Sequence, residues 1–123
     1  MLASCKIVPF VATLNTALAK TFYEEKLGLR LVEDSPWALV FDANGTMLRV
    51  TAVRELKPAE YTVLGWEVLD IHEAVRSLRA AGIELKRYPG MEQDEHGVWT
   101  APGGAQVAWF EDPDGNVLSV SRH

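Results

Sequence analysis

Few residues of this sequence carry side chains suited to acid–base, nucleophilic or metal chemistry. The chain has three histidines, His72, His96 and His123, and a single cysteine, Cys5. Imidazole and thiolate groups are common ligands of first-row metals and common catalytic bases and nucleophiles. Their spacing here matches no metal-binding motif and no Ser–His–Asp or Cys–His pair, and the chain lacks a glycine-rich phosphate loop.

Each of these groups also has an ordinary structural interpretation. His72 is the second residue of a predicted helix, so we expect its side chain to face solvent. His123 is the last residue, where mobility is expected. His96 lies in a predicted loop over 89–97 that could fold over the mouth of a binding site. A lone cysteine such as Cys5 is expected to be buried and inert.

Glu67 is the carboxylate with the most specific prediction. It lies on a predicted strand over 61–69, where alternate side chains point to opposite faces, and it shares its face with Val63 and Gly65. A carboxylate on an apolar surface would be partly desolvated and could act as a base or hold a cation. A structural ion pair, for instance with Arg49, is the alternative.

Aromatic residues are abundant, with four Trp, four Phe and three Tyr. Three are predicted to lie in the core: Phe22, Trp66 and Phe110. Four others are candidates for the wall or rim of a ligand cavity: Phe10, Trp37, Trp99 and Trp109. Aromatic rings in such positions stack on flat ligands, although ordinary packing is the alternative for Trp37 and Trp99.

Composition excludes several classes of protein. The 123 residues include 17 Asp and Glu against 12 Lys and Arg, which gives a net charge of −5 and argues against a nucleic-acid-binding face. No apolar run approaches the roughly 20 residues of a membrane span. The first residues lack the pattern of a signal peptide, so we expect a cytoplasmic protein. One cysteine allows neither an internal disulfide nor a multi-cysteine zinc site.

Apolar spacing and turn signals predict the same order of elements twice. In the first half a strand (5–12) precedes a helix (15–27) and three strands (29–33, 37–41 and 46–52). Asn15 is a suitable N-cap and Gly28 a suitable C-terminal residue for this helix. The sequence Asn44-Gly45 is a strong hairpin signal. Residues 53–60 are polar, contain Pro58 and are predicted to be a linker.

The second half begins with the strand over 61–69 and a helix between Asp70 and Gly82. Strands are then predicted over 83–88, 98–101, 106–111 and 117–121. We interpret each half as a β-α-β-β-β module, the first over about 5–52 and the second over about 61–121. Neither module could bury a four-stranded sheet alone, so the modules should pack together or across a dimer.

Three stretches resemble the vicinal oxygen chelate superfamily of glyoxalases, extradiol dioxygenases and bleomycin-resistance proteins. They are FYEEKLGL at 22–29, GWEVLDI at 65–71 and FEDPDGN at 110–116. The resemblance implies an α+β fold over a single domain, 1–123. Two paired βαβββ modules would form a curled mixed sheet around a cleft, with the helices on the convex face.

The resemblance also implies where a metal would bind. Family enzymes hold a divalent metal through side chains that would correspond here to Val8, Val63 and Ser119, with a further ligand near 47–49. Valine cannot coordinate a metal and serine is a poor ligand. By the same resemblance Glu67 would point into the cleft near Ser119 and Ser121. We therefore expect a member with no metal and no other cofactor.

Bleomycin-resistance proteins are the closest functional analogy, because they are acidic, of similar length and sequester a planar cationic drug. The expected function is to bind a small planar or aromatic compound, either cationic or neutral, as an antibiotic-resistance protein does. The expected ligand-binding residues are Phe10, Trp37, Val63, Glu67, Trp99, Trp109 and Ser119. We expect a homodimer that binds no nucleic acid and no membrane. The alternatives are a lyase or dioxygenase, metal-dependent or using Glu67 as base, and a subunit that only mediates assembly.

Overall fold

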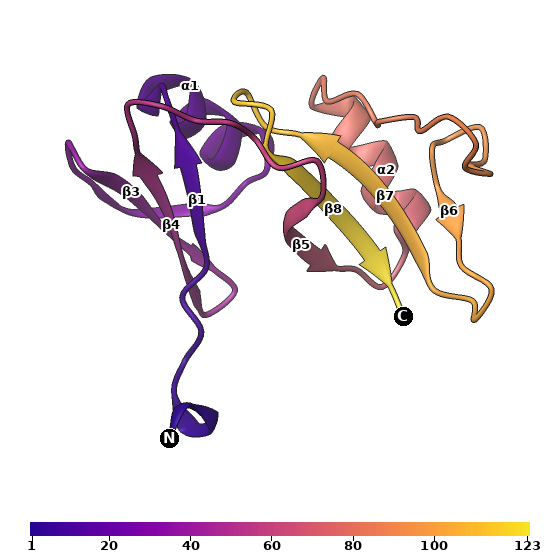
Figure 1. Ribbon diagram of the computed structural model, residues 1–123, viewed down its shortest axis with the longest axis horizontal. Helices are drawn as coiled ribbons and strands as arrows, with labels where there is room; N and C mark the ends of the chain where they lie inside the picture. The colour runs from indigo at the N-terminus through magenta and orange to yellow at the C-terminus, as the bar shows by residue number, and fades with distance from the viewer. The chain divides into compact units, whose positions relative to one another are not determined.

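The computed structural model describes residues 1–123, which divide into two compact units, Met1–Lys57 and Pro58–His123. Each unit contains one four-stranded mixed sheet and one helical segment after its first strand (Figure 1). The boundary lies inside the segment 53–60. The predicted α+β class with two βαβββ modules is confirmed. No helix is long and apolar enough to cross a membrane.

Unit 1 begins with an exposed 3-10 turn, η1 (Leu2–Ser4), and an extended segment. Its regular elements are β1 (Phe10–Thr13), α1 (Thr16–Lys20), η2 (Thr21–Lys26), β2 (Arg30–Asp34), β3 (Ala38–Ala43) and β4 (Thr46–Ala52). The strand order is β1-β4-β3-β2, in which only β1 and β4 are parallel. Buried side chains of β1, β3, β4 and the helical segment form the core of this unit.

The first helix starts where the sequence predicts but changes its winding halfway. Asn15 caps it, because its side-chain oxygen accepts a hydrogen bond from Leu18 N at 3.1 Å. After Lys20 the chain continues as the π-helix η2, which ends with a bond from Leu27 N to Phe22 O at 2.9 Å. Phe22 and the adjacent Tyr23 are both buried along this wider turn. The prediction of one α-helix over 15–27 therefore missed the π segment.

The predicted first strand, 5–12, is too long at its N-terminal end. Pro9 has no amide hydrogen to contribute to a ladder, and regular pairing starts only at Phe10, opposite Arg49. The residues before Pro9 are exposed. Cys5 is among them, as a free and exposed thiol, so the prediction of a buried Cys5 is wrong.

Unit 2 repeats the topology with shorter edge pairing. Its elements are β5 (Thr62–Glu67), α2 (Ile71–Ala80), β6 (Trp99–Thr100), β7 (Gln106–Glu111) and β8 (Val117–Arg122). The strand order is β5-β8-β7-β6, with β5 parallel to β8. Asp70 caps α2 by accepting a hydrogen bond from Glu73 N at 3.1 Å. Gly82 follows the helix with a positive φ of 84°, as a C-terminal glycine should.

The strand predicted over 83–88 does not form. Lys86 N donates to Trp109 O at 2.7 Å, but no ladder follows from this bond. The side chain of Gln93 replaces a neighbouring strand, because its amide group donates to Lys86 O and accepts from Tyr88 N. The edge of β7 farther along is occupied by β6, opposite Gln106 and Val107.

The core of unit 2 lies between the sheet and α2. Ile71 and Val75 of the helix are buried, as are Phe110 of β7 and Leu118 of β8. Trp66 of β5 stacks on Phe110 with ring centroids 6.4 Å apart, although its own side chain is only half-buried. Burial of Phe22 and Phe110 agrees with their prediction as core residues.

Candidate ligand-binding face

One face of the unit-2 sheet carries four of the seven predicted ligand-binding residues, and Val63 lies beside it on β5. The pairs Trp109–Ser119 and Ser119–Gly65 form one row across the strands. The pairs Trp99–Val107, Val107–Ser121 and Ser121–Glu67 form the next row. Paired residues point to the same side of a sheet, so these side chains share the face opposite α2. Val63 lies at the irregularity of β5 between Thr62 and Leu64, where the alternation expected for it is interrupted. We call this surface the Trp109 face.

Three aromatic rings meet on the Trp109 face. The Trp109 centroid lies 6.2 Å from that of Trp99, with the rings tilted by 37°, and 5.3 Å from that of Tyr88, in an edge-to-face contact. We call Tyr88, Trp99 and Trp109 the aromatic cluster. The cluster was only partly predicted, because Tyr88 lies in the segment misassigned as a strand.

Ser119 is the central polar group of this face and is only 6% exposed. It lies so close to β5 that a Cβ atom built on Gly65 would be 2.8 Å from the Ser119 hydroxyl oxygen. Any side chain at residue 65 would therefore displace the hydroxyl. The absence of a side chain at Gly65 leaves the hydroxyl next to the backbone of the neighbouring strand.

Glu67 occupies the end of the second row, beside Ser121. Its side chain is exposed and forms no hydrogen bond or ion pair in the structure, so the expected desolvation is not observed. The alternative pairing with Arg49 would join the two units and stays a hypothesis. Within unit 1, the guanidinium carbon of Arg49 lies 5.9 Å from the ring centroid of Phe10.

The two remaining candidates, Phe10 and Trp37, belong to unit 1. Phe10 is the first residue of β1 and is 61% exposed. Two other exposed apolar residues lie nearby: Val8 precedes it by two residues, and Met47 lies on the paired strand β4, two residues before Arg49. Trp37 lies at a bend before β3 and is 75% exposed. Both rings are accessible, and their role as ligand-binding residues stays a prediction.

A hollow of about 560 Å³ adjoins the aromatic cluster at Tyr88. Lys86 and Glu111 line it and form an ion pair of 2.9 Å, and Val117 forms part of its wall. The hydrogen bond to Glu111 raises the pKa of the Lys86 ammonium group. The Lys86 nitrogen also lies 5.6 Å from the Tyr88 ring centroid, a distance at which the ammonium group and the aromatic ring attract each other. The volume lies in the range typical of small-molecule sites.

The donor set on this face does not suit a metal. The positions that the resemblance assigns to metal ligands are occupied here by Val63 and Ser119, and no group of three or more His, Cys, Asp or Glu side chains is arranged to hold an ion. Glu67 is the one carboxylate in the two central rows. A single carboxylate and a hydroxyl fall short of the three or four ligands that a catalytic metal needs.

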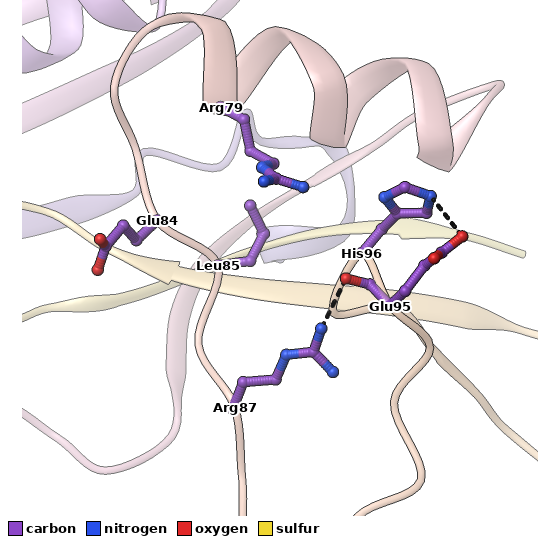
Figure 2. Close-up of a pocket in the computed structure, with 6 residues that line it drawn as sticks. All are labelled: Arg79, Glu84, Leu85, Arg87, Glu95 and His96. Atoms are coloured by element: carbon purple, nitrogen blue, oxygen red, sulfur yellow. Dashed lines mark hydrogen bonds and ion pairs between the residues drawn. The ribbon is translucent and has the colours of Figure 1, made fainter.

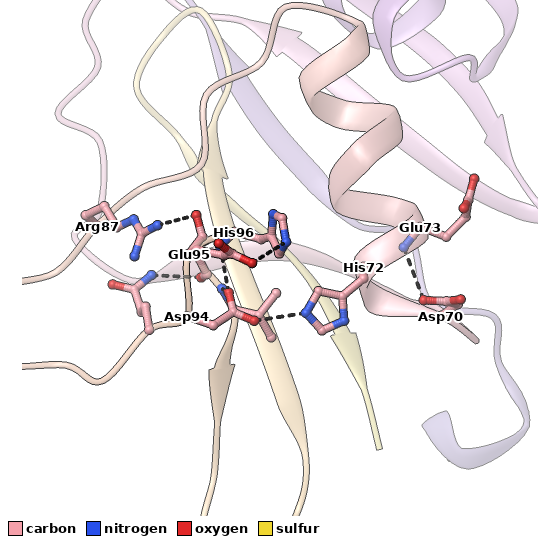
Figure 3. A network of polar contacts seen from close by, with 10 residues as sticks. Asp70, His72, Glu73, Arg87, Asp94, Glu95 and His96 are labelled. Atoms are coloured by element: carbon pink, nitrogen blue, oxygen red, sulfur yellow. Dashed lines mark hydrogen bonds and ion pairs between the residues drawn. The ribbon is translucent and has the colours of Figure 1, made fainter.

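Two histidines lie elsewhere in unit 2, His72 on α2 and His96 in the 89–97 loop (Figure 3). The Nε2 atom of His72 is 2.9 Å from an Asp94 carboxylate oxygen, and the His96 ring lies 5.6 Å from the His72 ring. The His72 side chain is partly exposed to solvent, as expected, and in addition it contacts Asp94. The 89–97 loop turns toward α2, which separates His96 from the Trp109 face. His123 contacts Ser121, with 3.1 Å between ring nitrogen and hydroxyl.

The carboxyl group of Asp94 is the organising centre of that loop. Partial burial by itself would raise its pKa, but hydrogen bonds from His72 and from the backbone N–H groups of Val98 and His96 together lower it. The carboxylate thus joins the loop to the first turn of α2.

Comparison with known proteins identifies the family. The family model of the Glyoxalase/Bleomycin resistance protein/Dioxygenase superfamily matches residues 8–120, and the chain belongs to this superfamily. None of the curated proteins compared with it is a significant sequence match.

Solved structures share the fold at low sequence identity. Lactoylglutathione lyase from Agrobacterium tumefaciens is 18% identical, with a TM-score of 0.76 and coverage of 97% of this chain and 93% of that one. A superfamily member from Sphaerobacter thermophilus is 20% identical, with a TM-score of 0.76 and complete coverage of both chains. A glyoxalase family protein from Enterococcus faecalis is 20% identical, with a TM-score of 0.71 and coverage of 98% and 99%.

Proposed function

We propose that this protein binds and sequesters a small planar aromatic compound, with a preference for cations, without a metal or other cofactor. The observation that carries the proposal is the aromatic cluster on the Trp109 face. Two indoles and a phenol there present apolar area with fixed geometry, which suits stacking on a flat ligand. The function is that of an antibiotic-resistance protein of the bleomycin-resistance type.

Charge on the same face supports the preference for cations. Glu67 is exposed, without a protein partner, and lies in the same row as Trp99. An aromatic cation could stack on the cluster while Glu67 supplies the opposite charge. The net charge of −5 would favour the approach of such a ligand.

Equilibrium dialysis with two flat tricyclic probes tests this proposal. Proflavine is cationic at neutral pH, and phenazine is neutral and of similar shape. Saturable binding of both, tighter for proflavine, is the expected result. Absence of saturable binding of either probe would contradict the proposal and favour a protein that only mediates assembly.

We further propose that the protein acts as a homodimer in the cytoplasm. The exposed apolar side chains of Phe10 and Met47 on the unit-1 sheet favour burial against a second copy of the chain. The free, exposed Cys5 suits a reducing compartment. Light scattering after size-exclusion chromatography should give twice the chain mass, and a monomer mass at micromolar concentration would exclude the dimer.

A metal-independent enzyme is the second candidate, and the unpaired carboxylate of Glu67 is the observation that favours it. A free carboxylate beside a ligand-binding surface can accept a proton from a bound carbon or oxygen acid. Turnover that disappears in Glu67→Gln while ligand binding persists would support this candidate. Stoichiometric metal that survives dialysis would instead support a metal-dependent lyase or dioxygenase.

A further inference from the structure

A second hollow in unit 2 lies on the helix side of the sheet, away from the Trp109 face. It has a volume of about 240 Å³ and is bounded by three segments (Figure 2). The end of α2 contributes Arg79, the segment after it contributes Glu84, Leu85 and Arg87, and the 89–97 loop contributes Glu95 and His96. Only one of these six side chains is apolar, so the hollow is built for a polar occupant.

The loop that closes this hollow is held in place by specific contacts. Gly97 has a φ of +88°, and a Cβ atom there would be 3.1 Å from Leu85 Cβ, so the missing side chain lets the loop approach Leu85. The Asp94 carboxylate accepts hydrogen bonds from two backbone amides of the loop and contacts His72 on α2 (Figure 3). The geometry of the hollow is thus set before any ligand arrives.

The two guanidinium groups of the hollow have no carboxylate partner. Arg87 donates only to the backbone oxygen of Glu95, at 2.8 Å, and Arg79 forms no hydrogen bond or ion pair. By contrast, Arg76 on the same helix is paired with Glu73 at 2.7 Å. Two unpaired guanidinium groups at one concave site leave their fork-shaped donors available to a ligand.

The acidic residues of the hollow do not neutralise these donors. In Figure 2 the Glu84 carboxylate points away from both guanidinium groups. The Glu95 carboxylate turns instead to His96, with 3.4 Å between oxygen and Nε2, and its side chain is 85% exposed. Both carboxylates thus line the hollow without forming an ion pair with either guanidinium group.

We propose that this hollow, lined by Arg79, Arg87 and His96, is an anion site for a phosphate group, either free or on a small ester. Guanidinium groups bind phosphate oxygens through paired, charge-assisted hydrogen bonds. The volume is below the roughly 300 Å³ of a typical drug-sized pocket, so it fits a single phosphate with little else. The site is independent of ligand binding on the Trp109 face.

Chemical-shift titration of the isotope-labelled full chain with inorganic phosphate tests the proposal, with acetate at equal ionic strength as the carboxylate comparison. Chemical-shift changes that saturate with phosphate concentration should be largest at residues 85–87 and 95–97. Arg79→Gln and Arg87→Gln should each weaken phosphate binding about tenfold, the loss of one charge-assisted interaction. Arg76→Gln, a matched change on the same helix, should leave the affinity within about twofold.

The outcomes that overturn the proposal are distinct from those that concern the Trp109 face. Absence of saturable chemical-shift changes at phosphate concentrations up to about 50 mM would exclude the site, because it would mean an affinity far weaker than millimolar. Equal weakening by all three Arg substitutions would show nonspecific screening of charge. Acetate binding as tight as phosphate binding would exclude a phosphate site. None of these results depends on whether proflavine binds.

Discussion

The indole rings of Trp99 and Trp109 lie with their centroids 6.2 Å apart on one face of the unit-2 sheet, although the two residues are ten positions apart in the chain. The β6–β7 hairpin creates this proximity, because Trp99 pairs with Val107, two residues before Trp109 on the same strand face. Together with Tyr88, whose ring meets Trp109 edge to face, the two indoles form an apolar patch. The predictions about ligand binding depend on this patch.

Trp109→Phe should reduce the quenching of tryptophan fluorescence by bound proflavine and weaken binding roughly tenfold, because it removes about 1–1.5 kcal/mol of aromatic contact. Trp66→Phe is the matched control, since Trp66 stacks on Phe110 on the opposite face. Steady-state fluorescence titration measures both variants. Equal effects of the two substitutions would show that the ligand does not touch the Trp109 face.

Glu67→Gln should remove the preference for cationic ligands while keeping the shape of the face. The ratio of proflavine affinity to phenazine affinity should fall several-fold, because an exposed charge interaction contributes about 0.2–1 kcal/mol. Calorimetric titration at low ionic strength, where screening is weakest, gives the ratio. Glu55→Gln changes the same charge in the 53–60 segment and serves as control. An unchanged ratio in Glu67→Gln would remove Glu67 from the site.

Gly97→Ala should destabilise unit 2 more than Gly104→Ala does. Both glycines have a positive φ, but a Cβ at residue 97 would press on Leu85 at 3.1 Å, whereas one at residue 104 would meet nothing within 4 Å. We expect losses of about 2–3 kcal/mol and about 1 kcal/mol respectively in the free energy of unfolding. Urea denaturation followed by circular dichroism measures both. Equal losses would mean that the loop does not need its close approach to Leu85.

Asp94 should contribute to stability at neutral pH and lose that contribution in acid. Its pKa in the folded chain is lowered, so the contribution is fully present above the unfolded-state value of about 4 and disappears as pH falls through the folded value. Asp94→Asn should therefore cost about 0.2–1 kcal/mol at pH 6, since the His72–Asp94 pair is partly exposed, and less at pH 3. Glu92→Gln in the same loop is the control. A cost that is equal at both pH values would disprove the electrostatic explanation.

Local signals predicted the parts of the fold that depend on neighbours in sequence. The caps at Asn15 and Asp70 form as expected, and Asn44 and Gly45 both adopt positive φ in the β3–β4 hairpin. Strand alternation correctly placed Trp109 and Phe110 on opposite faces of the sheet, because alternation depends only on the existence of the strand. The family resemblance placed Glu67 near Ser121, and the two residues are paired.

Features that depend on distant partners were not predictable in the same way. Residues 83–88 have strand-like composition, but the Gln93 side chain satisfies their backbone groups and no ladder forms. Tyr88 contacts Trp109 in the aromatic cluster, and His96 lines the hollow beside Arg79 and Arg87, only because the 89–97 loop folds back. Nothing in the spacing of these residues indicates that turn.

The most direct test of the central claim is a fluorescence titration of purified, EDTA-treated protein with proflavine. The account predicts saturable quenching of tryptophan emission whose midpoint is unchanged when divalent metal ions are added back. Lack of quenching in the metal-free protein, or quenching that appears only with added metal, would contradict a metal-free aromatic binding face.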